Sequence, residues 1–198
     1  LNSRVTANVN IQPDHSDPPP PNLPTIYCTA FWDGQFGTAN YARTGGCSNP
    51  GEISSILIHE FGHGLDHNDG LIPPENGEKG TSEAYADVSA FFVTHDSCSG
   101  RNAFTINCDG YGVPCISCTG ARDVDYAKRT PSQPHTPNGF IRGHCGLVPT
   151  GYGGPCGKEP HCESYILSEA VWDLATRKLA AGGIIDQHSA WEIAERLF

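Results

Sequence analysis

Three histidines and a glutamate in the segment SSILIHEFGHGLDHND, residues 54–69, have the types and spacing of a metal site. His59, Glu60 and His63 form the pattern H-E-x-x-H within a predicted helix. Residues four apart lie one turn apart on the same helix face, so both imidazoles can reach one zinc ion at about 2.0–2.1 Å. Glu60 is one step round from His59, where a carboxylate can take a proton from water without ligating the metal. The pattern therefore predicts two zinc ligands and a general base.

The third ligand is left open between two carboxylates, because a catalytic zinc takes three protein ligands and keeps one position free. Asp69 lies ten residues after His59, the spacing of metzincin-type proteases. In those proteins a glycine stands midway, where this chain has Asp66, and a methionine turn lies beneath the metal, but this chain contains no Met. Glu83, in TSEAYADV, is the other candidate. Asp87 follows it by four residues and can accept the free N–H of a ligand histidine.

These residues resemble the gluzincin zinc metallopeptidases and, within them, the thermolysin-like proteases. In that family H-E-x-x-H is followed by a helix that carries E-x-x-x-D, and the ligand glutamate comes twenty residues after the second histidine. Here Glu83 follows His63 by 83 − 63 = 20 residues. The resemblance implies zinc bound by His59, His63 and Glu83, with Glu60 as general base and Asp87 orienting His59.

Three further segments are similar to that family and follow its order along the chain. AFWDG, residues 30–34, resembles the edge strand whose backbone pairs with a bound peptide. ARDVDYAK, residues 121–128, resembles the segment whose arginine holds a substrate carbonyl, and HCESYILSEAVWDLA, residues 161–175, resembles the helix opened by the histidine that stabilises the oxyanion. The resemblance therefore implies His161 as a catalytic residue and the following substrate-binding residues: Arg122, Thr29, Ala30, Phe31 and Trp32.

The chain departs from the family at two supporting positions. Cys156 stands where the family has the acidic partner of the oxyanion histidine, which leaves Glu159 or no residue for that role. Pro74 stands where the family has a tyrosine that assists the oxyanion, which leaves the histidine and zinc alone or another residue such as Tyr111 or Tyr152. The acidic residues of the family's calcium sites are not evident, so Ca²⁺ is not indicated.

The elements that position these side chains follow from periodicity and breakers. Alternation in VTANVNIQ, residues 5–12, and the β-branched and aromatic run TIYCTAFWDG, residues 25–34, predict two strands. Residues 13–24 predict an extended connector, and residues 35–50 a loop with Cys28 and Cys47 as a disulfide clasp. Little regular structure is expected over residues 95–160. Helices are predicted over residues 51–68, 82–94, 162–181 and 188–198.

The resemblance implies an α+β, two-lobed zincin fold in a single catalytic domain. Residues 1–68 would form an N-terminal β-containing lobe with the edge strand and the active-site helix. Residues 69–198 would form a mainly helical, loop-rich lobe with the ligand-glutamate helix and the Cys-rich loops.

Composition limits the other classes of function. A formal charge of −10 argues against a nucleic-acid groove. No apolar run reaches 18 residues, so no membrane span is predicted. Nine cysteines indicate an oxidising compartment and a disulfide-stabilised, secreted or extracellular chain. The sequence begins at Leu1 without an initiating Met, so a pro-segment or flanking domains outside this sequence are expected. Two disulfides are favoured over a four-thiolate zinc site among these residues: Cys98, Cys108, Cys115 and Cys118.

The sequence thus predicts a secreted zinc endopeptidase acting on peptide or protein substrates. A zinc-containing but non-catalytic extracellular module of a larger protein is the alternative from another class. A metzincin-type protease that uses Asp69 as third ligand would keep the reaction and change one ligand.

Overall fold

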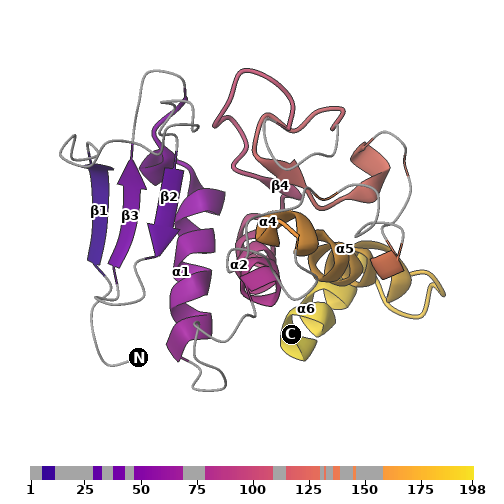
Figure 1. Cartoon of the computed structure of the whole chain (residues 1–198). Coiled ribbons are helices and arrows are strands. Elements are labelled where there is room, and N and C mark those ends of the chain that lie inside the picture. The colour runs from indigo at the N-terminus through magenta and orange to yellow at the C-terminus, as the bar shows by residue number, and fades with distance from the viewer. Residues whose placement is uncertain are drawn as a thin grey trace.

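The computed structural model describes residues 6–11, 29–32, 38–42, 47–68, 79–108, 115–129, 132, 136–138, 145 and 158–198. It combines helices with small sheets, which confirms the α+β class. A three-stranded sheet lies at one side of the molecule and the C-terminal helices lie at the other (Figure 1). Two long helices, α1 (Ser54–Asn68) and α2 (Lys79–Thr94), run between them and pack on each other. Within the described residues, no helix is both long and apolar enough to span a membrane.

The three-stranded sheet has the order β1-β3-β2. β1 (Thr6–Ile11) is parallel to the central strand β3 (Thr38–Ala42), and β2 (Thr29–Trp32) is antiparallel to it. The predictions of β1 and β2 are confirmed. The prediction of a loop over residues 35–50 is wrong where β3 forms. Its sequence TANYA has weak strand propensity, and pairing with a strand on each side stabilises it.

The helix α1 follows a short 3₁₀ turn, Pro50–Glu52, in which the Asn49 side chain accepts a hydrogen bond from the Gly51 N–H at 3.1 Å. The predicted helix over residues 51–68 is therefore confirmed except for its first turn. α2 begins three residues before the predicted start at residue 82. The two helices approach closely at Gly62, where an added Cβ would lie 2.7 Å from the Cα of Ala86. This close approach brings the polar face of α1 against α2.

A Gly62→Ala substitution is expected to destabilise the fold by about 1–3 kcal/mol, the usual cost of overpacking. Alanine favours a helix over glycine by up to about 1 kcal/mol, but the clash is with backbone, which cannot rotate away as a side chain does. The midpoint of denaturant unfolding measures the change. Gly182→Ala is the control, because its added Cβ would meet only the Ile184 side chain at 3.7 Å. A stabilised Gly62→Ala protein would contradict the close packing.

The C-terminal helices enclose an aromatic core on the far side of α2. The predicted helix over residues 162–181 is divided into α4 (Pro160–Glu163), α5 (Tyr165–Asp173) and a π-helical segment (Leu174–Lys178), and α6 (Gln187–Leu197) follows. Phe91 of α2 packs edge-on against Trp172 at 5.3 Å between ring centroids, and Trp172 packs against Trp191 at 5.5 Å. These buried rings pack one face of α2 against the C-terminal helices, and the opposite face of α2 packs against α1.

The region from residue 95 onward is held by disulfides and short elements. β4 (Cys98–Ser99) pairs with β5 (Arg122–Asp123), and a 3₁₀ turn spans Tyr126–Lys128. The described cysteine pairs, which favour disulfides over a four-thiolate zinc site as predicted, are Cys98–Cys118, Cys108–Cys115 and Cys145–Cys162. Cys47 is also disulfide-bonded. Its predicted partner Cys28, the predicted connector over residues 13–24 and Cys156 lie outside the described residues.

Candidate metal centre

Two helices bring together the three predicted metal ligands. His59 and His63 come from α1 and Glu83 from α2, and one ligand atom from each lies within 4.8 Å of the others. The Glu83 carboxylate lies between the rings, with Oε2 3.2 Å from His59 Nε2 and Oε1 3.5 Å from His63 Nε2. The two imidazole planes are nearly perpendicular, at 88°. The spacing in the sequence therefore corresponds to a real cluster.

The geometry of this cluster fits a small tetrahedral cation. Ligand atoms at about 2.0–2.1 Å from a tetrahedral zinc are separated by about 3.3 Å, close to both observed N–O distances. Glu83 Oε2 is buried and has no well-directed hydrogen bond. A bound cation would give this atom a direct partner in addition to the His59 ring at 3.2 Å and the Arg122 guanidinium at 3.5 Å. Two imidazoles and a carboxylate form a donor set typical of zinc, with one coordination position left open.

Asp87 and Arg122 support the cluster from beneath. Asp87 Oδ1 lies 3.1 Å from His59 Nδ1, and Nε2 of the same ring faces Glu83. Arg122 donates to both oxygens of Asp87, at 2.8 Å from Nε and 2.6 Å from Nη2. The arginine is 3% exposed, and its Nη2 lies 3.5 Å from Glu83 Oε2. Its observed contact is thus with Asp87, and its contact with a substrate carbonyl stays a prediction.

The buried carboxylates of Glu83 and Asp87 favour positive charge on the groups beside them. Burial alone would lower the pKa of His59, but Asp87 and Glu83 beside it carry that pKa to about 10. Burial lowers the pKa of His63 to about 4, against the attraction of Glu83. Among the protein groups alone, a proton on His59 therefore helps to balance Glu83 and Asp87. A divalent cation would supply that positive charge instead and release the proton.

Glu60 has the environment of a base near neutral pH. It lies on α1 beside the ligand cluster and is 5% exposed. Burial raises the pKa of Glu60 to about 7; Glu83 adds to the rise, and His59 opposes it. A general base works best when its pKa is near the working pH. The pKa of Glu60 is thus near the value that a general base needs at neutral pH, and its role as the base stays a prediction.

Ser82 is a supporting residue that the sequence analysis did not assign to the site. Its Oγ lies 3.1 Å from His63 Nδ1, so the hydroxyl can hold that ring with Nε2 turned toward Glu83. Partners of this kind fix the tautomer and orientation of a ligand histidine. The available signal was its position, immediately before the ligand glutamate on the same helix.

A Ser82→Ala substitution is expected to weaken the affinity for added Zn²⁺ by about 10–100-fold, the usual effect of removing a partner of a ligand. Competition with a chelator at fixed pH measures the change. Ser82→Thr keeps the hydroxyl and is the matched control, expected to bind nearly as tightly as the parent chain. Equal affinities in all three proteins would remove Ser82 from the site.

His161 stands beside the cluster. Its Nε2 lies 3.3 Å from Glu83 Oε1, but it is not part of the group whose ligand atoms lie within 4.8 Å of one another. Its Nδ1 lies 2.5 Å from Glu159 Oε1, so the structure gives this histidine an acidic neighbour two residues earlier in the chain. The side chain of His161 is 32% exposed, against 9% for His59, which puts the accessible side of the cluster near His161.

The predicted substrate strand lies next to α1. β2 pairs with β3 along one edge, and the helix lies on its other side (Figure 1). Trp32 packs on α1 at Gly64, where an added Cβ would meet the indole at 2.8 Å. Thr29 and Phe31 are exposed and Ala30 is half-buried. The structure therefore places this strand beside α1, the helix that carries His59 and His63, and its role in substrate binding stays a prediction.

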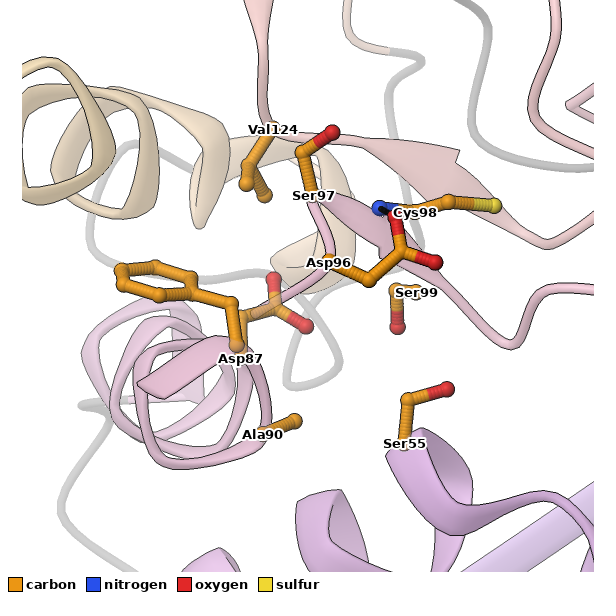
Figure 2. Close-up of a pocket in the computed structure, with 9 residues that line it drawn as sticks. Ser55, Asp87, Ala90, Asp96, Ser97, Cys98, Ser99 and Val124 are labelled. Carbon is orange, nitrogen blue, oxygen red and sulfur yellow. Dashed lines mark hydrogen bonds between the residues drawn. The ribbon is translucent and has the colours of Figure 1, made fainter. Parts of the chain in front are cut away.

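A small pocket lies on the inner side of Asp87, between α2, the first turn of α1 and β4 (Figure 2). Ser55 lines it and accepts a hydrogen bond from the Gly100 N–H at 3.0 Å, which ties α1 to the segment after α2. Other predicted candidates lie outside the described residues: Asp69, Pro74, Tyr111 and Tyr152.

Comparison of the sequence with protein-family models and with curated proteins finds no match. The functional argument therefore rests on the residues of the metal centre.

Proposed function

We propose that this chain is a zinc-dependent endopeptidase of gluzincin type, which hydrolyses peptide bonds in peptide or protein substrates. The observation that carries the proposal is the position of Glu83, which α2 places 3.2 and 3.5 Å from the two imidazoles of H-E-x-x-H on α1. A structural zinc site is normally closed by four protein ligands. Three ligands with a buried glutamate beside them suit catalysis better.

His59, His63 and Glu83 would hold the zinc ion. When bound, zinc supplies a Lewis acid and brings the pKa of water down to about 7. Glu60 accepts the proton of the attacking water, which the pKa of about 7 for its carboxyl permits near neutral pH. The same carboxyl then donates that proton to the leaving amine. Asp87 holds His59, and Ser82 holds His63, so the ligand atoms stay fixed.

His161 would donate from its ring to the oxygen that becomes negative as the carbonyl is attacked. Glu159 orients the ring through Nδ1, which leaves Nε2 on the side of Glu83. A positioned donor of this kind lowers the barrier by about 2.7–4 kcal/mol. Arg122 would hold an adjoining carbonyl while it fixes Asp87.

The edge of β2 that does not pair with β3 would pair with an extended substrate. Strand addition uses main-chain hydrogen bonds, so it accepts many sequences. Phe31 is 46% exposed on this strand and would contact substrate side chains. The two-lobed zincin fold, a secreted location and a pro-segment or flanking domains belong to the same proposal, and the disulfides support the extracellular part of it.

The test combines zinc content with cleavage of a quenched fluorescent peptide library by the purified chain. One zinc per chain, with cleavage that a chelator abolishes and added Zn²⁺ restores, is the expected result. One zinc without cleavage of any peptide would instead favour a non-catalytic zinc-containing module. No bound zinc after loading would overturn both assignments.

A further inference from the structure

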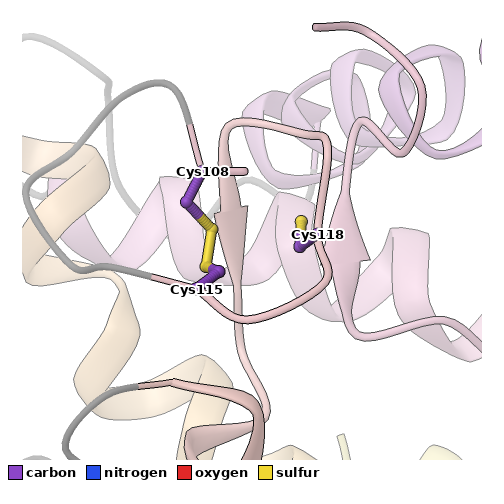
Figure 3. Close-up of side chains that lie close together, drawn as sticks. All are labelled: Cys108, Cys115 and Cys118. Atoms are coloured by element: carbon purple, nitrogen blue, oxygen red, sulfur yellow. A yellow bond between two sulfur atoms is a disulfide. The ribbon is translucent and has the colours of Figure 1, made fainter. Parts of the chain in front are cut away.

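Three sulfur atoms from two different disulfides lie together in the loops that follow α2 along the chain. Cys108 is bonded to Cys115, Cys118 is bonded to Cys98, and the Sγ atoms of Cys108, Cys115 and Cys118 are within 4.8 Å of one another (Figure 3). The backbone keeps them close, since the Cys108 N–H donates to the Cys118 carbonyl at 2.7 Å. Thiolate attack on a disulfide requires this proximity of a third sulfur.

The two disulfides differ in their access to solvent. Cys98 and Cys118 are 0% exposed, whereas Cys108 and Cys115 are half-buried and lie beside Ile116, which is 59% exposed. A thiol in solution can reach the Cys108–Cys115 bond but not the Cys98–Cys118 bond. The buried disulfide is therefore open to reduction only through a sulfur of this chain.

We infer that the two disulfides form an exchange pair in which reduction of Cys108–Cys115 is passed through Cys115 to Cys118 and frees Cys98. Cys115 and Cys118 are spaced as C-x-x-C, the spacing of dithiols that exchange readily. Cys108 lies ten residues from Cys118 along the chain and lacks that short tether. The spacing thus selects Cys115 as the internal nucleophile.

The exchange balances in three steps. A thiolate RS⁻ attacks Cys108 Sγ, which forms a mixed disulfide and releases the Cys115 thiolate. This thiolate attacks Cys118 Sγ, which forms Cys115–Cys118, breaks Cys98–Cys118 and releases the Cys98 thiolate to take a proton from water. A second RS⁻ attacks the RS sulfur of the mixed disulfide, which forms RSSR and releases the Cys108 thiolate to take a proton from water.

The buried disulfide contacts Arg122, whose side chain holds Asp87 beside the metal cluster. Breaking this disulfide is therefore expected to affect the metal centre. Cys98–Cys118 joins the segment after α2 to the segment before β5, and Cys118 Sγ lies 3.2 Å from the Arg122 carbonyl oxygen. β4 and β5 pair Ser99 with Arg122, whose guanidinium holds Asp87. Freeing Cys98 is expected to loosen this pairing.

The test treats the whole chain with increasing reduced glutathione, labels thiols with an alkylating reagent and maps them by peptide mass spectrometry. We expect three changes once one of the two disulfides is lost. Cys98 carries the label, Cys108 carries label or glutathione, and a new bond joins Cys115 to Cys118. Label on Cys108 and Cys115 with Cys98–Cys118 intact would overturn the inference. Neither readout uses zinc or peptide hydrolysis, so the result is independent of the proposed function.

Two variants sharpen the assignment. Cys108→Ser leaves the Cys115 thiol free from the start, and label on Cys98 without any reductant is expected. Cys115→Ser leaves Cys108 free, and label on Cys108 but on neither Cys98 nor Cys118 is expected. Label on Cys98 in this variant would show that C-x-x-C spacing does not select the nucleophile. Hydrogen exchange of the Ala121 and Val124 amides, which donate across β4 and β5 at 2.9 Å, should quicken as Cys98 is freed. Unchanged exchange would overturn the link to Arg122.

Discussion

A Glu60→Gln variant is expected to retain its zinc and to lose peptide hydrolysis by about 10²–10⁴-fold in kcat, the range that general acid–base catalysis contributes. Glutamine has the size of glutamate but cannot take a proton from water. Glu60 is outside the group of ligand atoms formed by His59, His63 and Glu83, so its replacement leaves the metal in place. Initial rates on a quenched peptide, with zinc content of the same samples, measure both effects.

Two controls separate loss of the base from loss of the fold. Burial raises the pKa of Glu60 to about 7, so this site does not favour a charged side chain and the neutral amide should not lower the melting temperature. Glu195→Gln, on the exposed side of α6, removes a carboxylate that is not part of the metal cluster and should leave the rate unchanged. Full activity of zinc-loaded Glu60→Gln would assign the base to another residue.

The helices and the pairing of His59 with His63 on one face could be predicted because they depend on local spacing. His59 and His63 share a face of α1 through the four-residue repeat of any helix. Glu83 and Asp87 share a face of α2 for the same reason. The contact between the two helices is not local, and the resemblance supplied it. Gly62 carried the physical signal, since a missing side chain lets α2 approach.

The supporting contacts could not be predicted because they cross between elements. The Arg122 guanidinium reaches Asp87 over 35 residues of sequence, and Ser82 meets His63 over 19. Residue spacing does not specify contacts of this kind, which require that both elements are already placed. β3 escaped prediction for a related reason, because its weak strand propensity is offset by pairing on both sides.

Glu159 is the acidic neighbour of His161 in the structure, at a position different from the one that the family resemblance indicates. The sequence left Glu159 open for this role, since the family's acidic position holds Cys156. In the structure Glu159 is the N-cap of α4, and its Oε2 accepts from the Cys162 N–H at 2.8 Å. The cap fixes the carboxylate, and its other oxygen then lies on His161 Nδ1. One hydrogen-bonded turn therefore both begins the helix and orients the histidine.

A Glu83→Gln variant is expected to lose zinc altogether under conditions in which the parent chain retains one ion. The loss should exceed the 10–100-fold weakening that follows removal of a partner of a ligand. The amide cannot balance the cation, and it would leave His59 and His63 as the remaining ligands of the cluster. Zinc content after dialysis against a weak chelator measures the effect.

Asp69→Asn is the control and should retain zinc and activity, because the Glu83 carboxylate already lies 3.2 Å from His59 Nε2. Zinc lost in Asp69→Asn and kept in Glu83→Gln would contradict this assignment and would make the site metzincin-like. The contacts of Glu83 would then be those of a buried charge pair, in which a proton on His59 balances the carboxylate.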